Sequence, residues 1–189
     1  MSELFSIQLQ NRQQQGRDGV WLDLPTTTEQ VQAALRQIGI SSDNPQGLFI
    51  SGYFAEEEKR FAIPYNMVLA SNVDELNFLA ARLETLSAGE RAELNAALQA
   101  PQSELSSIGR ITDFPENVDY YVHLPDVHGP AQLGDYYLNR SGMVDMPDEW
   151  KGGIDTAQFG RYVAQQEQGA FTQYGYLVKS GDEWQKVHE

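Results

Sequence analysis

The chain has 189 residues, with 13 Lys and Arg against 27 Asp and Glu, which gives a formal net charge of −14. The absence of cysteine excludes a disulfide scaffold, a thiolate zinc site and a cysteine nucleophile, and it fits a reducing compartment such as the cytoplasm. The negative charge argues against direct binding of nucleic acid or of an anionic membrane. No apolar run approaches the roughly 20 residues that span a bilayer.

The first third of the sequence predicts short strands around one helix. Apolar and polar residues alternate over 5–9 and over 20–24, which is the pattern of half-buried strands. A helix is expected over 26–39, opened by a capping box in which Thr26 pairs with the glutamate three positions later. The apolar and aromatic run over 48–54 predicts a central strand.

The middle third predicts three or four short helices. They are expected over 64–69, 72–86, 87–101 and 103–108, where apolar residues recur at helical spacing between proline and polar breaks. Asn72 precedes an acidic first turn and is the expected N-cap of its helix. These segments together predict a small helical bundle.

The last third predicts mixed structure. A strand is expected over 120–124, and helices are expected over 133–142 and over 155–169, the second capped by its leading aspartate. The segments 174–179 and 183–187 flank a Ser-Gly-Asp turn and predict a C-terminal hairpin.

These elements predict an α+β protein that forms an elongated chain of three small lobes. The expected lobes are an N-terminal α+β lobe over 1–61, a helical lobe over 62–110 and a C-terminal α+β lobe over 111–189. Lobes of this size would be marginally stable alone, so association of the chain is expected.

The sequence lacks the motifs of common enzyme classes, such as a nucleophile elbow, a P-loop or a zinc-protease helix. His123 and His128 lie near an aspartate, which suggests a metal site, but Pro125 breaks the geometry and favours loop or strand-edge histidines. His188 is expected to be frayed at the terminus. Carboxylate pairs suitable for a small hydrolase are abundant and none is singled out, so no catalytic residue, metal or cofactor is expected.

Acidic residues concentrate in two segments. The segment 113–155 holds nine acids against Arg140 and Lys151, and the segment 38–58 holds four acids and no base. Such segments form either a solvated surface or an electronegative surface that a DNA-binding protein takes for DNA. Because B-DNA carries about two phosphates per base pair, the charge of one chain corresponds to roughly 7 bp and that of a dimer to roughly 14 bp. Composition leaves both interpretations open.

Seven stretches of the chain, taken together and in this order, resemble one protein family: Val20–Pro25, Ile38–Ile40, Asn72–Ala80, Leu133–Tyr137, Gly153–Arg161, Gly169–Thr172 and Gly175–Tyr176. The chain is similar in them to the ArdA antirestriction proteins, which are carried by mobile genetic elements such as conjugative plasmids and transposons. Two departures are a threonine at position 156, where family members often have an aromatic residue, and a net charge of −14, which is less negative than that of many members.

The resemblance implies a dimeric DNA mimic in which no bond is made or broken. Its carboxylates would pair with Lys and Arg in the DNA-binding groove of the methyltransferase core of type I restriction–modification enzymes. Two alternatives remain open, an acidic binding module for another basic DNA-binding protein and a small carboxylate-dependent hydrolase. The carboxylates expected to contact the partner are Glu56, Glu57, Glu58, Asp113, Glu116, Asp119, Asp126, Asp135, Asp145, Asp148 and Glu149.

Overall fold

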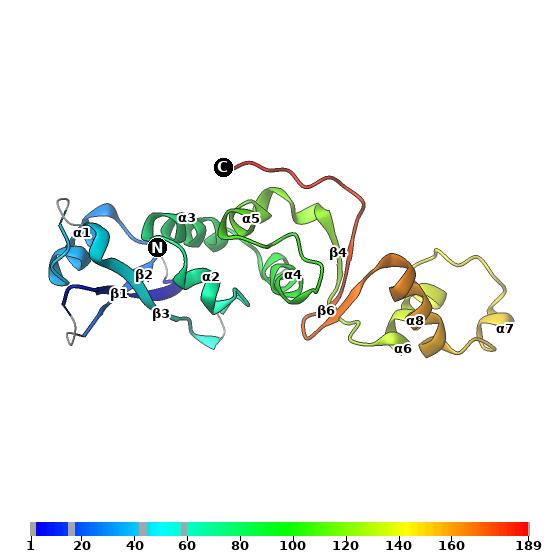
Figure 1. Ribbon diagram of the computed structural model, residues 1–189. Helices are drawn as coiled ribbons and strands as arrows, with labels where there is room; N and C mark the ends of the chain where they lie inside the picture. The colour runs from blue at the N-terminus through cyan, green and yellow to red at the C-terminus, as the bar shows by residue number, and fades with distance from the viewer. Residues whose placement is uncertain (1–2, 15–17, 42–44, 58–59, 189) are drawn as a thin grey trace. The chain divides into compact units, whose positions relative to one another are not determined.

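The computed structural model describes residues 3–14, 18–41, 45–57 and 60–188 (Figure 1). Helices and antiparallel strands both occur, with the strands in two small sheets. The predicted α+β class is therefore confirmed.

The chain divides into two compact units, each with helices and one three-stranded sheet. The first unit is built from the described residues of Met1–Ser87, Leu105–Pro115 and Lys186–Glu189, and the second from Ala88–Glu104 and Glu116–Gln185. The boundaries of the three predicted lobes stay a prediction.

The sheet of the first unit has the order β2-β1-β3, with β1 (Phe5–Asn11) between β2 (Val20–Leu24) and β3 (Leu48–Phe54). Burial alternates along β1, and Ile7 and Leu9 are fully buried, which confirms the period-two pattern. The prediction that 48–54 is a central strand is wrong, because β3 lies at the edge of this sheet, next to β1. Its apolar residues reflect packing against the helix that follows it rather than pairing on both edges.

The first helix, α1 (Thr28–Gln37), begins one residue later than the sequence pattern predicts. The Thr27 hydroxyl accepts a hydrogen bond from the Gln30 backbone at 3.4 Å, and the Gln30 side chain accepts one from the Thr27 backbone at 3.2 Å. The backbone N–H of Thr26 donates instead to the side chain of Asn77, which lies 51 residues away. A tertiary contact therefore shifts the cap by one position.

Three further helices complete the first unit: α2 (Tyr65–Leu69), α3 (Val73–Glu84) and α5 (Ile108–Thr112). Asn72 caps α3 as predicted, since its side chain accepts a hydrogen bond from the Glu75 backbone at 2.9 Å. The helix expected over 103–108 is not at that position. Helix α5 begins at Ile108, the last residue of the expected range, because Ser107 is its N-cap. Helices α3 and α5 pack against each other.

The sheet of the second unit has the order β4-β6-β5, with all pairs antiparallel. The predicted hairpin of 174–179 with 183–187 is wrong, because the first of these segments forms β6 and pairs with β5 and β4, while 183–187 lies in no strand. The elements of this unit are α4 (Ala88–Gln99), β4 (Tyr121–Leu124), α6 (Pro130–Asp135), a π-helical turn (Tyr136–Arg140), α7 (Asp148–Lys151), α8 (Thr156–Glu167), β5 (Ala170–Thr172) and β6 (Gly175–Lys179). Short 3-10 turns lie at Pro45–Gly47, Phe114–Glu116 and Val118–Tyr120.

Two glycines bring α6 and α8 into backbone contact in the second unit. A Cβ atom on Gly134 would collide with the carbonyl oxygen of Thr156, and one on Gly160 would collide with the carbonyl oxygen of Pro130. No other residue type leaves room for this crossing. The Asp155 side chain caps α8 as predicted, accepting a hydrogen bond from the Gln158 backbone at 2.9 Å.

The segment after β6 is held by two buried polar side chains. In the second unit, the Asn117 amide donates to the Gln185 carbonyl at 2.9 Å and accepts from its N–H at 2.7 Å. In the first unit, one oxygen of Asp113 accepts from the His188 backbone at 2.9 Å and lies 2.7 Å from its ring. The His188 ring also packs edge-on against Phe78 at 5.1 Å. The prediction that His188 is frayed is therefore wrong.

Candidate partner-binding surface

The excess of negative charge lies mainly in the second unit. That unit contains 14 acidic and five basic side chains, a net charge of −9, whereas the first unit contains 13 acidic and eight basic side chains, a net charge of −5. A cationic partner would therefore be drawn more strongly to the second unit.

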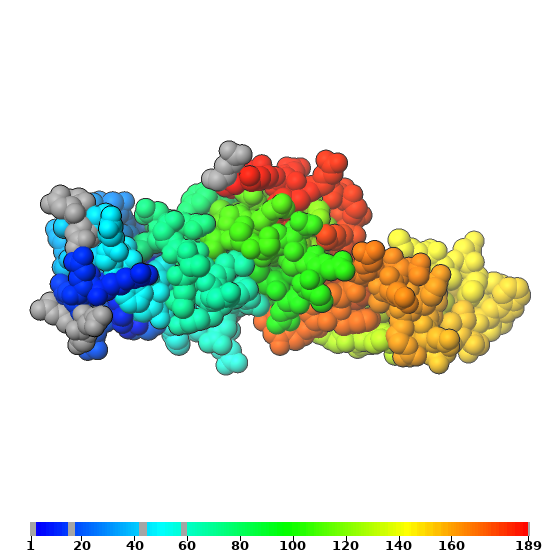
Figure 2. All heavy atoms as spheres, viewed as in Figure 1, coloured from blue at the N-terminus to red at the C-terminus, as the bar shows by residue number. Residues whose placement is uncertain are grey.

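Most of the predicted contact carboxylates of the second unit are exposed. They lie in turns and at element ends rather than within the sheet, and the Asp148 side chain keeps 95% of its surface. In Figure 2 the segment around α7, drawn in yellow, lies at the surface of the face in view. The exposed residues of the set in this unit are Glu116, Asp119, Asp126, Asp145, Asp148 and Glu149.

Both basic residues of the segment 113–155 are engaged by acids within it. The Arg140 guanidinium lies 3.3 Å from the half-buried Asp135 carboxylate, which also accepts a hydrogen bond from Asn139 at 2.9 Å. Lys151, whose side chain is only 19% exposed, lies 3.1 Å from Asp148. These local pairs reduce the charge that Asp135 and Asp148 can offer to a partner, and they leave the other exposed acids of the segment dominant.

The expected contact residues of the first unit include Glu56 and Glu57, which are exposed and lie just after β3, beyond Ala55. Glu58 lies outside the described residues. The nearby Arg60 side chain donates to the Ala55 carbonyl at 3.4 Å.

Asp113, one of the expected contact residues, is buried in the structure. Its exposure is only 1%, and its carboxylate is hydrogen-bonded to the backbone and ring of His188. A carboxylate buried this way cannot reach a partner without breaking those bonds. The Asp113 carboxylate therefore stabilises the fold. The sequence alone could not indicate this contact, because His188 is 75 residues away.

One surface hollow brings together acids that are distant in the sequence. A hollow of about 360 Å³ is lined by Glu116, Asp182 and Glu183, with Trp184 at its side. The hydrogen bonds between Asn117 and Gln185, 68 residues apart, hold these two segments together. Sequence reasoning missed Asp182 and Glu183 because no local signal predicts this pairing.

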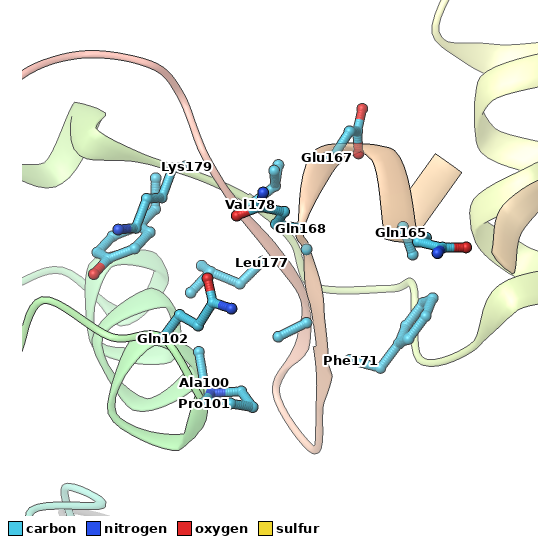
Figure 3. A pocket seen from close by; sticks show the side chains of 14 residues that line it. Ala100, Pro101, Gln102, Gln165, Glu167, Gln168, Phe171, Leu177, Val178 and Lys179 are labelled. Atoms are coloured by element: carbon cyan, nitrogen blue, oxygen red, sulfur yellow. The ribbon is translucent and has the colours of Figure 1, made fainter. Parts of the chain in front are cut away.

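A larger hollow of about 530 Å³ lies in the second unit among the ends of α4 and α8 and the strands β5 and β6 (Figure 3). Its charged groups are already engaged, because Glu167 accepts hydrogen bonds from the phenols of Tyr137 at 2.6 Å and Tyr176 at 3.0 Å. Lys179 lies 2.8 Å from Glu104. Burial and then the Glu167 charge raise the pKa of the Tyr176 phenol. These contacts join Glu167 to two tyrosines and Lys179 to Glu104 within the second unit.

The histidines that suggested a metal site have other contacts. The Nε2 atom of His123 lies 2.7 Å from the Tyr174 carbonyl oxygen, so this ring nitrogen donates a hydrogen bond to it. In the part of the chain that the structure describes, no group of three or more His, Asp or Glu residues is arranged to hold a metal ion. Within the same residues no helix has the length and apolar character needed to cross a membrane.

Comparison with known proteins gives one family match. The model of the family described as antirestriction protein (ArdA) matches residues 15–178, which include most of the first unit and nearly all of the second. A search of curated proteins finds no match to the chain.

Proposed function

The chain belongs to the ArdA family of antirestriction proteins, and from this premise we propose that it is a DNA mimic that inhibits type I restriction–modification enzymes. Membership of the family implies an antirestriction function and an interaction with restriction–modification enzymes. The proposal adds how the interaction works. The protein occupies the DNA-binding groove of the methyltransferase core in place of DNA.

The observation that carries this proposal is the concentration of exposed carboxylates on the second unit, which has a net charge of −9. A groove that binds DNA presents Lys and Arg to phosphates, and carboxylates satisfy the same donors. The local cations of the acidic segment, Arg140 and Lys151, are held by Asp135 and Asp148. The other acids of this segment that are exposed in the second unit face solvent, where a basic partner can approach them.

Each ion pair between the protein and the enzyme contributes little binding free energy, so high affinity requires many such pairs. An exposed ion pair is worth roughly 0.2–1 kcal/mol, so an inhibitor that acts by charge needs many pairs. The summed field also accelerates encounter with an oppositely charged groove. A homodimer, which we propose as the active form, doubles the charge and matches roughly 14 bp of DNA.

Competition with DNA tests this proposal. A purified type I enzyme is titrated with the protein at several concentrations of target DNA, and DNA occupancy is measured directly. Because both ligands use one groove, the concentration of protein that displaces half of the DNA should rise in proportion to the DNA concentration.

The control for this experiment is an unrelated basic DNA-binding protein. Displacement of DNA from the type I enzyme at far lower protein concentration supports the proposal. Equal displacement from both proteins would instead indicate a general acidic binding module. Displacement that does not depend on DNA concentration would exclude a shared groove.

A further inference from the structure

One glutamate of the second unit is placed where a charged carboxylate is unfavourable. Glu93 lies on α4, the helix that packs on β4 and β6, next to the fully buried Leu94. Its Oε1 atom is shielded from solvent and has no hydrogen-bond partner among the described residues. An ionised oxygen in this position loses its hydration without compensation.

The charges nearest to Glu93 add to this penalty. Burial is the largest effect on the carboxyl, and the negative charges of Glu90, one turn earlier on α4, and of Asp119 act in the same direction. Together they raise the pKa of Glu93 to about 8, from an ordinary value of 4.5.

The strands packed against α4 do not offset this charge. The ionisable residues of β4 are Tyr121 and His123, and that of β6 is Lys179. The ammonium of Lys179 lies 2.8 Å from the Glu104 carboxylate, and the Tyr121 phenol accepts a hydrogen bond from the Glu104 backbone. The His123 ring donates a hydrogen bond to the Tyr174 carbonyl oxygen. None of these three contacts supplies a donor to Glu93.

We propose that Glu93 is protonated in the folded protein at neutral pH and that loss of this proton lowers the stability of the second unit. A protonated carboxyl is neutral, so it can be buried beside two other acids at small cost. Loss of the proton adds a negative charge that Glu90 and Asp119 repel. The outcome is a second unit whose stability depends on pH.

The direction of the effect follows from proton linkage. The pKa of Glu93 in the folded chain, about 8, lies above its value of 4.5 in the unfolded chain. Stability from this group is fully present below pH 4.5 and falls as the pH rises toward 8. Over that range the folding equilibrium constant drops by up to about tenfold per pH unit.

Equilibrium urea unfolding of the full chain between pH 5.5 and 8.5 tests this directly, with wild type compared to Glu93→Gln. Glutamine keeps the shape of the protonated group and cannot ionise. The ratio of the two folding equilibrium constants should therefore shift toward Glu93→Gln as the pH rises. The control Glu183→Gln alters an exposed acid of the same unit, and its ratio to wild type should stay constant with pH.

Carbon-13 NMR of the Glu93 carboxyl in the wild-type protein gives a second readout that needs no substitution. The midpoint is expected near 8, and Glu90→Gln should lower it because one neighbouring negative charge is removed. Amide exchange in α4, corrected for its intrinsic pH dependence, should accelerate above this midpoint. A midpoint below about 6, or parallel stability profiles for wild type and Glu93→Gln, would overturn the proposal.

Discussion

Acidic residues of the same sequence segment have different roles, and the buried ones can be told from the surface ones by their exposure. Asp113 and Asp126 belong to the same acidic segment, yet the first is 1% exposed and bonded to His188 while the second is exposed. Sequence reasoning treats both as surface carboxylates because local composition does not reveal a partner 75 residues away. The same limit applies to the raised pKa of Glu93, which depends on Asp119 and on the buried side of α4.

Replacement of Asp113 by Asn should lower stability without a specific loss of partner binding. The amide oxygen can take the place of the carboxylate oxygen that contacts the backbone and ring of His188, but it is neutral and accepts hydrogen bonds less strongly, so a loss of about 1–3 kcal/mol is expected. Urea unfolding measures this loss, with the exposed Asp126→Asn as the matched control, expected within about 0.5 kcal/mol of wild type. If Asp113→Asn folds as stably as wild type and lowers affinity for a type I enzyme more than Asp126→Asn does, Asp113 is a contact residue after all.

At the scale of helices and strands, the sequence predicts correctly those features that depend on residues close together in the chain. The caps of α3 and α8 by Asn72 and Asp155 are confirmed because each side chain bonds to a backbone group three residues away. The hairpin is wrong because strand pairing is non-local, and β6 finds its partners in β5 and β4 rather than in 183–187. The cap of α1 moves by one residue because Thr26 bonds to Asn77.

The crossing of α6 and α8 explains why glycine stands at positions 134 and 160. Gly134→Ala should destabilise the second unit by at least about 2–3 kcal/mol, because a methyl group there meets backbone atoms that cannot rotate away. Thermal unfolding followed by circular dichroism measures the change. The matched control is Gly89→Ala in the first turn of α4, where a Cβ meets no atom within 4 Å.

This control should leave stability unchanged or raise it by up to about 1 kcal/mol, because alanine favours the helix. Equal stability of Gly134→Ala and wild type would mean that α6 and α8 do not approach as closely as described.

At the scale of the whole molecule, net charge is the sum over many residues, so it can be predicted from the sequence without recognising any motif. The count of acids predicts an electronegative protein, and the structure adds that the excess lies in the second unit and that acids distant in sequence, such as Glu116 and Asp182, line one hollow. Which carboxylates occupy positions equivalent to phosphates depends on three-dimensional spacing, which composition does not contain.

Neutralisation of the exposed acids should weaken partner binding in a graded way. Asp148→Asn or Glu149→Gln alone should cost about 0.2–1 kcal/mol of binding free energy, and the triple variant that adds Asp145→Asn should cost close to the sum. The matched control neutralises three exposed acids of the first unit, Asp18, Glu29 and Asp74.

Affinity for a purified type I enzyme, measured by calorimetry, is the readout. The control triple should weaken binding less than the triple of the second unit. A single substitution that abolishes binding in a folded protein, with all others silent, would point to one localised site instead of a mimic of a phosphate track.

The most direct test of the DNA-mimic account is the salt dependence of binding to a type I enzyme, measured without DNA so that the enzyme's own affinity for DNA does not contribute. Between ~50 and ~300 mM salt the Debye length falls from about 14 to 6 Å, so contacts between exposed charges are strongly screened. The account predicts that affinity falls at least about tenfold over this range and falls less for the variant neutralised at positions 145, 148 and 149. An affinity that stays constant across the range would contradict binding through the acidic surface.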